Sequence, residues 1–151
     1  MDAVNLGFQD DTFDCPFCVQ NGISAFGVDK KNLIGEAVRV TKPGGTVLFS
    51  SYSDAFWEQR LRWFKIQSQE GLLGEIVHRQ TTRGVIVCRD GFRASTVTAA
   101  EFKALTSHLD AEVDITEVDQ SSVFCVVSRG GDTPIECACA ALDTFHVSHL
   151  M

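Results

Sequence analysis

The chain has 151 residues, of which 44% are hydrophobic and 22% are charged, and its formal net charge is −7. This length and composition predict one globular domain with a real core and exclude wholesale disorder. The acidic balance makes nucleic acid an unfavourable partner, because phosphate backbones are repelled, and it favours a small molecule as substrate.

Export and membrane insertion have no signal in the sequence. The segment that begins at Met1 has no positively charged region, and no apolar run approaches the length that crosses a bilayer. We therefore expect a cytoplasmic protein with no membrane partner. In that compartment the six cysteines are expected to be free thiols rather than a disulfide framework.

The first predicted strand runs from Phe13 to Val19. Pro16 interrupts it, and because proline lacks the N–H that a central strand needs, this strand is expected at an edge of the sheet or with a bulge. Gln20, Asn21 and Gly22 end the strand at its carboxyl edge. Open α/β sheets bind their ligands at that edge, so this turn is a candidate binding loop, although Asn-Gly is also a common turn pair.

The stretch from Asp29 to Ser53 predicts a helix, a stop and a buried strand. The Asp29 carboxylate can accept hydrogen bonds from the first turn of the helix. Pro43 cannot continue the helix, and the glycine pair after it can take the positive φ that ends it. Thr46–Phe49 shows no polar alternation, which is typical of a strand covered on both faces in a parallel sheet. Together these elements form half of a βαβ unit.

These residues resemble the class I methyltransferases that use S-adenosylmethionine. The helix-to-strand junction of that family commonly reads EAxRVxKPGGxxLxSSY, and Glu36–Tyr52 follows this pattern. Asp2–Gly22 also looks like the family's Asp-Ala segment, acidic turn and fourth strand, in the expected order and at the expected separation. The resemblance covers Asp2–Arg129 and matches only the second half of the family's domain.

The resemblance implies an α/β fold, in which a partial Rossmann-like sheet of parallel strands with an antiparallel last strand carries helices and an inserted β-hairpin. It also implies methyl transfer from S-adenosylmethionine to a small-molecule acceptor. Such a cofactor carries the reactive carbon and the protein orients the acceptor, so no catalytic residue and no metal is assigned. The residues expected to bind the cofactor are Asp2, Ala3, Val19 and Gln20. Those expected to bind the acceptor are Asn21, Tyr52 and Arg93.

The segment after Tyr52 predicts a helix from Asp54 to about Glu70, followed by a hairpin. Residues 75–89 resemble two short strands around a turn at Thr82–Gly84. Inserted after the sheet's fifth strand, this hairpin would lie over the cofactor edge as a lid, where acceptor specificity is usually set. Beside it, the arginines at positions 89 and 93 are candidate bidentate partners for a carboxylate on the acceptor.

The last part of the chain predicts a helix, a pair of strands and a second helix. A capping box at Thr98 opens the first helix near Ala99. Residues 111–118 and 122–128 are expected to pair antiparallel across a tight turn. Residues 1–129 would thus form the methyltransferase part, with residues 130–151 adding an amphipathic helix that the family pattern does not include.

The glycine-rich turn that binds the cofactor in this family precedes the part that the chain resembles, and no such turn precedes Asp2. We therefore expect a fragment, or a mispredicted start, of a longer methyltransferase, with weak or no activity alone. One alternative is a stand-alone half that self-associates or pairs with another chain through the exposed edge of the Phe13 strand. Another is a non-catalytic α/β module for binding or oligomerisation.

A different chemistry is suggested by Cys15 and Cys18, because CPFC has the C-x-x-C spacing of thiol oxidoreductases and looks like a glutaredoxin active site. That chemistry needs an exposed cysteine at a helix N-terminus, whereas a turn follows here. Zinc binding would need further ligands at an unusual C-x-C spacing. Those further candidates are Cys137, Cys139, His146 and His149. We favour small apolar packing for the cysteines over both.

Overall fold

The computed structural model describes residues 2–20 and 22–131. Its helices are α1 (Gly22–Ala25), α2 (Lys30–Arg39), α3 (Trp57–Gln69) and α4 (Ala99–Thr106), with a short 3₁₀ helix η1 (Asp54–Phe56). Its strands are β1 (Phe17–Cys18), β2 (Thr46–Tyr52), β3 (Val85–Val87), β4 (Arg93–Ser95), β5 (Ala111–Val118) and β6 (Ser122–Arg129). No helix in this part of the chain is long and apolar enough to cross a membrane. The predicted C-terminal helix falls on residues 132–151, outside the described residues.

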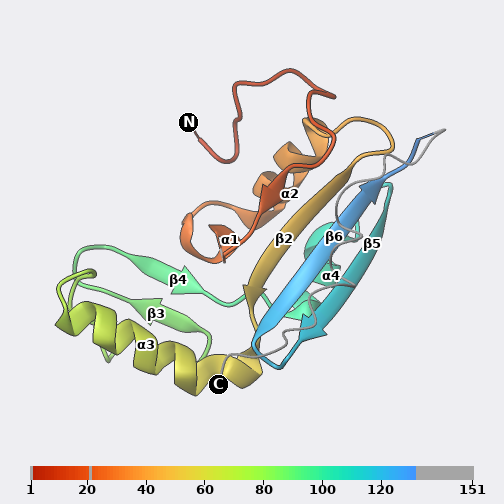
Figure 1. The fold of residues 1–151 in the computed structure, drawn as a ribbon. Coiled ribbons are helices and arrows are strands. Elements are labelled where there is room, and N and C mark those ends of the chain that lie inside the picture. The colour runs from red at the N-terminus through yellow and green to blue at the C-terminus, as the bar shows by residue number, and fades with distance from the viewer. Residues whose placement is uncertain (1, 21, 132–151) are drawn as a thin grey trace.

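Four strands form the central sheet in the order β1-β2-β6-β5 (Figure 1). β1 pairs in parallel with β2, so that Phe17 lies opposite Leu48. β6 runs antiparallel between β2 and β5, and Val126 lies on the other side of Leu48. Asp119 and Gln120 connect β5 to β6 with φ values of 51° and 54°. The parallel pair and the antiparallel last strands are both confirmed.

Helix α2 begins as its sequence predicts and ends a few residues before Pro43. The Asp29 carboxylate accepts a hydrogen bond from the Asn32 N–H at 2.8 Å. The last residue of the helix is Arg39, with Val40 as its C-cap, and Gly44 takes a φ of 79° in the later turn that leads into β2. The turn reverses the direction of the chain, so that β2 runs back along α2, as in a βαβ unit.

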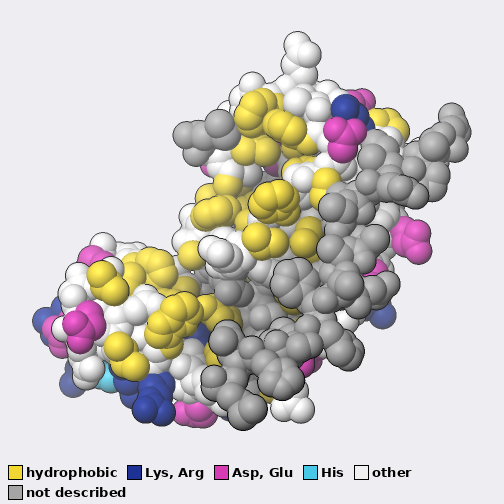
Figure 2. Space-filling model, in the orientation of Figure 1, with side chains coloured by type: hydrophobic (Ala, Val, Ile, Leu, Met, Phe, Trp, Pro, Cys, Tyr) yellow, Lys and Arg dark blue, Asp and Glu magenta, His cyan; other side chains and the backbone are white. Residues whose placement is uncertain are grey.

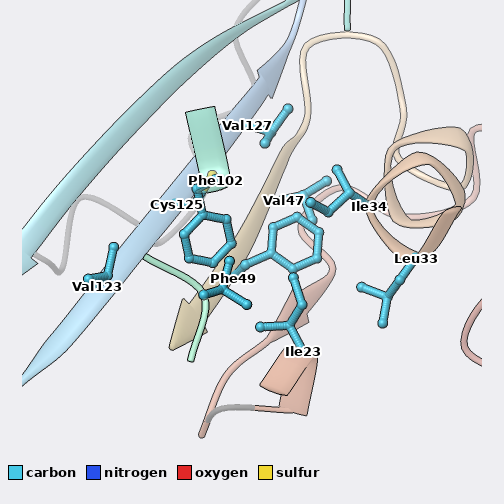
Figure 3. Packing of buried hydrophobic residues seen from close by; sticks show 10 residues of the cluster. Ile23, Leu33, Ile34, Val47, Phe49, Phe102, Val123, Cys125 and Val127 are labelled. Atoms are coloured by element: carbon cyan, nitrogen blue, oxygen red, sulfur yellow. The ribbon is translucent and has the colours of Figure 1, made fainter. Parts of the chain in front are cut away.

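Helices α1, α2 and α4 pack against one face of the sheet. The buried side chains on that face are Val47, Phe49, Val123, Cys125 and Val127 from the strands and Phe102 from α4 (Figure 3). Their spacing of two residues is the period of a strand with one packed face. Leu48, which points to the opposite face, is only half-buried, so the complete burial on both faces predicted for Thr46–Phe49 is not seen at this residue.

The strand predicted from Phe13 to Val19 is much shorter than expected. Its regular part is β1, and Phe13 makes only an isolated parallel bridge to Thr41. Between them the β2 backbone still donates hydrogen bonds to the carbonyls of Asp14 and Pro16, at 3.0 and 3.2 Å. Proline has no N–H to donate in return, so the ladder is regular only beyond Pro16.

The α3, β3 and β4 elements form a second unit with an apolar core of its own. That core contains Trp57, Phe64, Ile76, Ile86, Cys88 and Ala94. Residues 75–89 reverse at the predicted turn, where Thr82 and Val85 exchange backbone hydrogen bonds at 3.0 and 2.8 Å and Ile76 bridges Cys88, but the regular strand pairing is that of β3 with β4. The turn between β3 and β4 includes Asp90, whose carboxylate accepts the Phe92 N–H at 3.0 Å and stabilises that reversal.

The close approach of Gly45 to Asp14 yields a test of the β1–β2 junction. A methyl group added at Gly45 would lie 2.6 Å from the Asp14 carbonyl oxygen, whereas one added at Gly35 in α2 meets no other atom within 4 Å. We expect Gly45→Ala to lower the free energy of unfolding by about 1–3 kcal/mol, and Gly35→Ala to raise it by about 0.5–1 kcal/mol. Urea unfolding measures both, and equal effects would contradict the close packing of this junction.

Candidate functional site

A network around Arg39 holds the N-terminal segment against α2. The guanidinium donates to the carbonyls of Leu6 and Phe8 at 3.2 and 3.0 Å, and it pairs with the carboxylates of Glu36 and Asp10. The Glu36 carboxylate also accepts the Leu6 N–H at 2.7 Å. The hydrogen bond from Arg39 lowers the pKa of Glu36. Hydrogen bonds to Glu36 and then to Asp10 raise the pKa of Arg39.

The segment held in this way brings two of the predicted cofactor residues to one cavity. Ala3 and Val19 both line a space of about 340 Å³ beside β1. The aromatic residues Phe17 and Phe26 belong to its lining and expose 70% and 54% of their surface. Hydrophobic side chains gather over β1 and α1 in the space-filling view (Figure 2). Asp2 lines a neighbouring hollow that shares Ala3 with this cavity.

The loop after β1 contains two more of the predicted binding residues, Gln20 for the cofactor and Asn21 for the acceptor. Gln20 takes a φ of 55°, which a non-glycine residue adopts only when the surrounding structure fixes the turn. Its neighbour Asn21 lies outside the described residues, so its predicted role in acceptor binding stays a prediction. Ser24, in the following helix α1, is buried and shares a hydrogen bond with Ser51 of β2, their hydroxyl oxygens 3.0 Å apart. This hydrogen bond therefore links α1, the helix that follows β1, to the carboxyl end of β2.

Hydroxyl groups form a buried layer where β2 ends. Besides its contact with Ser24, the Ser51 hydroxyl accepts the Val97 N–H at 2.8 Å. Ser53 accepts the Ala55 N–H at 3.0 Å and donates to the Glu117 carboxylate at 2.6 Å. The strand end is thus hydrogen-bonded to several elements that follow it in the chain.

Arg60 is a residue of this edge for which the sequence predicts no role, because an arginine within an amphipathic helix is expected on its exposed face. The structure buries it, with 1% of its surface exposed. Its guanidinium carbon lies 4.6 Å from the centre of the Tyr52 ring and 5.7 Å from that of Phe64. Burial lowers the pKa of Arg60. A signal was available, because Phe56, Arg60 and Phe64 are spaced by four residues and share one helix face.

The arginine proposed earlier for the acceptor lies elsewhere in this unit. Arg93 is exposed at the start of β4, opposite Val87. Arg89 is exposed as well and pairs with Glu75 at 2.9 Å. Tyr52 itself is half-buried and stacks on Phe56, the ring centres 6.2 Å apart. The structure therefore brings Arg60 against Tyr52, and the predicted role of Arg93 in acceptor binding stays a prediction.

The cysteines give little support to redox or zinc chemistry. Cys18 is a free thiol in β1, not at a helix N-terminus, and burial raises its pKa, whereas a reactive thiol needs a lowered one. Cys15 is disulfide-bonded, so the expectation of free thiols is wrong for this residue. Cys88 and Cys125 are free and buried. Within residues 2–20 and 22–131 no cluster of side chains is suited to a metal ion, and the predicted ligands from Cys137 onward lie outside this part.

Comparison with known proteins identifies other proteins that share this fold. A family model for a methyltransferase domain matches residues 1–49. No curated protein matches the chain. Among solved structures, an S-adenosylmethionine-dependent methyltransferase from Clostridium acetobutylicum is similar with a TM-score of 0.59 and 16% identity, over 87% of this chain and 63% of that one.

Two further structures are similar to a comparable degree. One is a methyltransferase of the same cofactor dependence from Methanosarcina mazei, with a TM-score of 0.57 and 19% identity over 87% of this chain and 66% of that one. The other, from Thermotoga maritima, is described as a possible histamine N-methyltransferase. Its TM-score is 0.53 and its identity 16%, over 84% of this chain and 61% of that one.

The sheet order and these neighbours define the fold as that of the class I S-adenosylmethionine-dependent methyltransferases. The resemblance inferred from the Glu36–Tyr52 motif is confirmed at this level. The chain carries part of that fold, since it spans 61–66% of the length of the three structures.

The Arg39 network predicts a dependence of stability on pH. Because the folded pKa of Glu36 is lowered, its stabilising effect is complete above its ordinary pKa of 4.5 and is lost as the pH falls through the lowered folded value. We expect Glu36→Gln to be less stable than the wild type at pH 7 and the difference to shrink below about pH 4.5.

Urea unfolding at pH 7, 5, 4 and 3 measures this difference. Glu58→Gln, in the exposed first turn of α3, removes the same charge away from the network and is the matched control. A difference between wild type and Glu36→Gln that stays constant down to pH 3 would count against the network.

Proposed function

We propose that this fold serves S-adenosylmethionine-dependent methyl transfer to a small-molecule acceptor. The observation that carries the proposal is the parallel β1–β2 pair, beside which lies a cavity lined by Ala3, by Val19 just after the carboxyl end of β1, and by Val47 and Phe49 in the middle of β2. Ligands of open α/β sheets bind at the carboxyl edge. The family model for a methyltransferase domain matches residues 1–49, which include Ala3, Val19 and most of the Glu36–Tyr52 motif.

The lining of the cavity suits one part of the cofactor better than the rest. All of its lining side chains are apolar, which favours the flat adenine ring. The ribose hydroxyls and the charged amino-acid end of S-adenosylmethionine need polar partners, and among the described residues this cavity supplies no polar side chain. We therefore propose that residues 1–151 alone bind the cofactor weakly and have little activity by themselves.

The reaction makes modest demands on this chain. When bound, the cofactor supplies an activated methyl group, and the protein needs only to orient the acceptor in line with it. We propose that Tyr52, at the end of β2, takes part in orienting the acceptor, and that Gln20, after β1, contacts the cofactor. The net charge of −7 favours a small acceptor over nucleic acid.

Cofactor binding is testable by calorimetric titration with S-adenosylmethionine. We expect a dissociation constant of roughly 1 mM or weaker. NMR titration should place the residual binding at Ala3 and Val19, and Ala3→Phe should abolish it by filling the cavity. Ala100→Phe, at an exposed position of α4, is the control that should leave binding unchanged. Micromolar affinity would overturn the weak-binding proposal, and shifts confined to other residues would overturn the site.

The open edge of β1 supports a second proposal, that the chain self-associates there. β1 pairs with β2 on one side, and Phe17 exposes 70% of its surface beside the apolar cavity. Unpaired strand edges with exposed apolar side chains are templates for pairing with another chain. A second copy of this chain is the partner that the proposal names.

Sedimentation equilibrium tests the self-association. Phe17→Ser should weaken it by about tenfold or more, because a large apolar side chain no longer becomes buried. Leu72→Ser removes a side chain with 73% exposure from the loop after α3 and should have no effect. A wild-type protein that stays monomeric at high concentration would refute the proposal.

A further inference from the structure

The buried guanidinium of Arg60 is only partly satisfied. Its Nη1 donates a hydrogen bond to the Thr96 hydroxyl at 2.7 Å. Its Nε and Nη2 are buried and have no hydrogen-bond partner among the described residues. Leaving a buried polar group unpaired is unfavourable, and more so for a charged group, so the unsatisfied nitrogens of Arg60 need a physical explanation.

The two unsatisfied nitrogens lie on the same edge of the guanidinium. Nε and Nη2 carry the parallel N–H bonds with which arginine binds both oxygens of a carboxylate. The bond from Nη1 to Thr96 fixes the rotation of the group about its long axis, and the Thr96 N–H is held in turn by the Gly84 carbonyl at 2.6 Å. The free edge is therefore presented in a fixed orientation.

The position of Arg60 connects this edge with the proposed reaction. The Tyr52 ring that covers the guanidinium is the last residue of β2 and lies at the carboxyl edge of the sheet. In Figure 1 the β2 arrow ends where η1 and α3 begin. Tyr52 is half-buried, so the covered face of the guanidinium lies one side chain away from solvent.

We propose that Arg60 is the residue that binds the acceptor, and that the acceptor carries a carboxylate, which occupies the free Nε–Nη2 edge. This assignment rests on the proposed methyl-transfer function, whose acceptor class it names. A carboxylate fits better than a phosphate, because the free edge offers two parallel donors to two oxygens and the negative charge of Asp54, which also acts on this guanidinium, disfavours a doubly charged anion. It replaces Arg93, which is exposed, as the expected acceptor-binding arginine.

The experiment measures thermal unfolding of the whole chain with added sodium acetate, inorganic phosphate or sodium chloride at equal ionic strength and pH 7. Acetate should raise the wild-type Tm by about 2–4 °C above the chloride value, because a ligand that binds only the folded state stabilises it. Arg60→Met should lose this shift. Arg62→Met, on the exposed side of the same helix, and Arg93→Met should keep it.

A second measurement does not depend on how the variants fold. In the ¹⁵N-labelled wild type, the Nε–Hε resonance of Arg60 should move on addition of acetate, while that of Arg93 stays in place. A wild type that responds to acetate no more than to chloride, a shift retained by Arg60→Met, or a shift lost in Arg93→Met overturns the assignment. A larger effect of phosphate overturns the choice of a carboxylate.

These outcomes are separable from those of the cofactor titration, because no S-adenosylmethionine is present. An Arg60-dependent acetate effect, found together with S-adenosylmethionine shifts confined to residues other than Ala3 and Val19, would leave the anion site standing and overturn the proposed cofactor site. Cofactor binding at Ala3 and Val19 without an acetate effect would leave the cofactor site standing and overturn the anion site at Arg60.

Discussion

The pairing of β2 with two different neighbours is the constraint on which the rest of the structure depends. On one side β2 is parallel to β1, which brings the carboxyl ends of both strands to one edge of the sheet. On the other side it is antiparallel to β6 over its whole length. A slip of one residue would turn Val47 and Phe49 away from the core, so the register that buries the core also places the ligand edge.

That edge combines satisfied and unsatisfied polar groups in close proximity. The hydroxyls of Ser24, Ser51 and Ser53 are hydrogen-bonded, so burial of this layer costs little. The Arg60 guanidinium has one bond where it can make several. A local cost of this kind, inside a surrounding structure that is otherwise well packed, is typical of a site that exists for a ligand rather than for stability.

The described residues form two separate apolar cores, and Arg60 contacts residues from both parts of the structure. The core of the sheet lies under α1, α2 and α4, and the smaller one lies between α3 and the β3–β4 hairpin. Arg60 connects them, since Tyr52 belongs to β2 and Thr96 directly follows β4. The second unit therefore contacts the carboxyl end of β2 through Arg60. It does so although its regular strand pair, β3 with β4, differs from the predicted hairpin.

The sequence by itself determined the features that depend on residues close together in the chain. The Asp29 cap, the capping box at Thr98 and the turn at Asp119–Gln120 are local hydrogen-bonding and φ preferences, and they occur where predicted. Only the tertiary structure decided how short β1 is, which strand β3 pairs with, and that Arg60 is buried. These outcomes depend on contacts between segments far apart in sequence, whose pairing competes with other arrangements that satisfy the local pattern equally well.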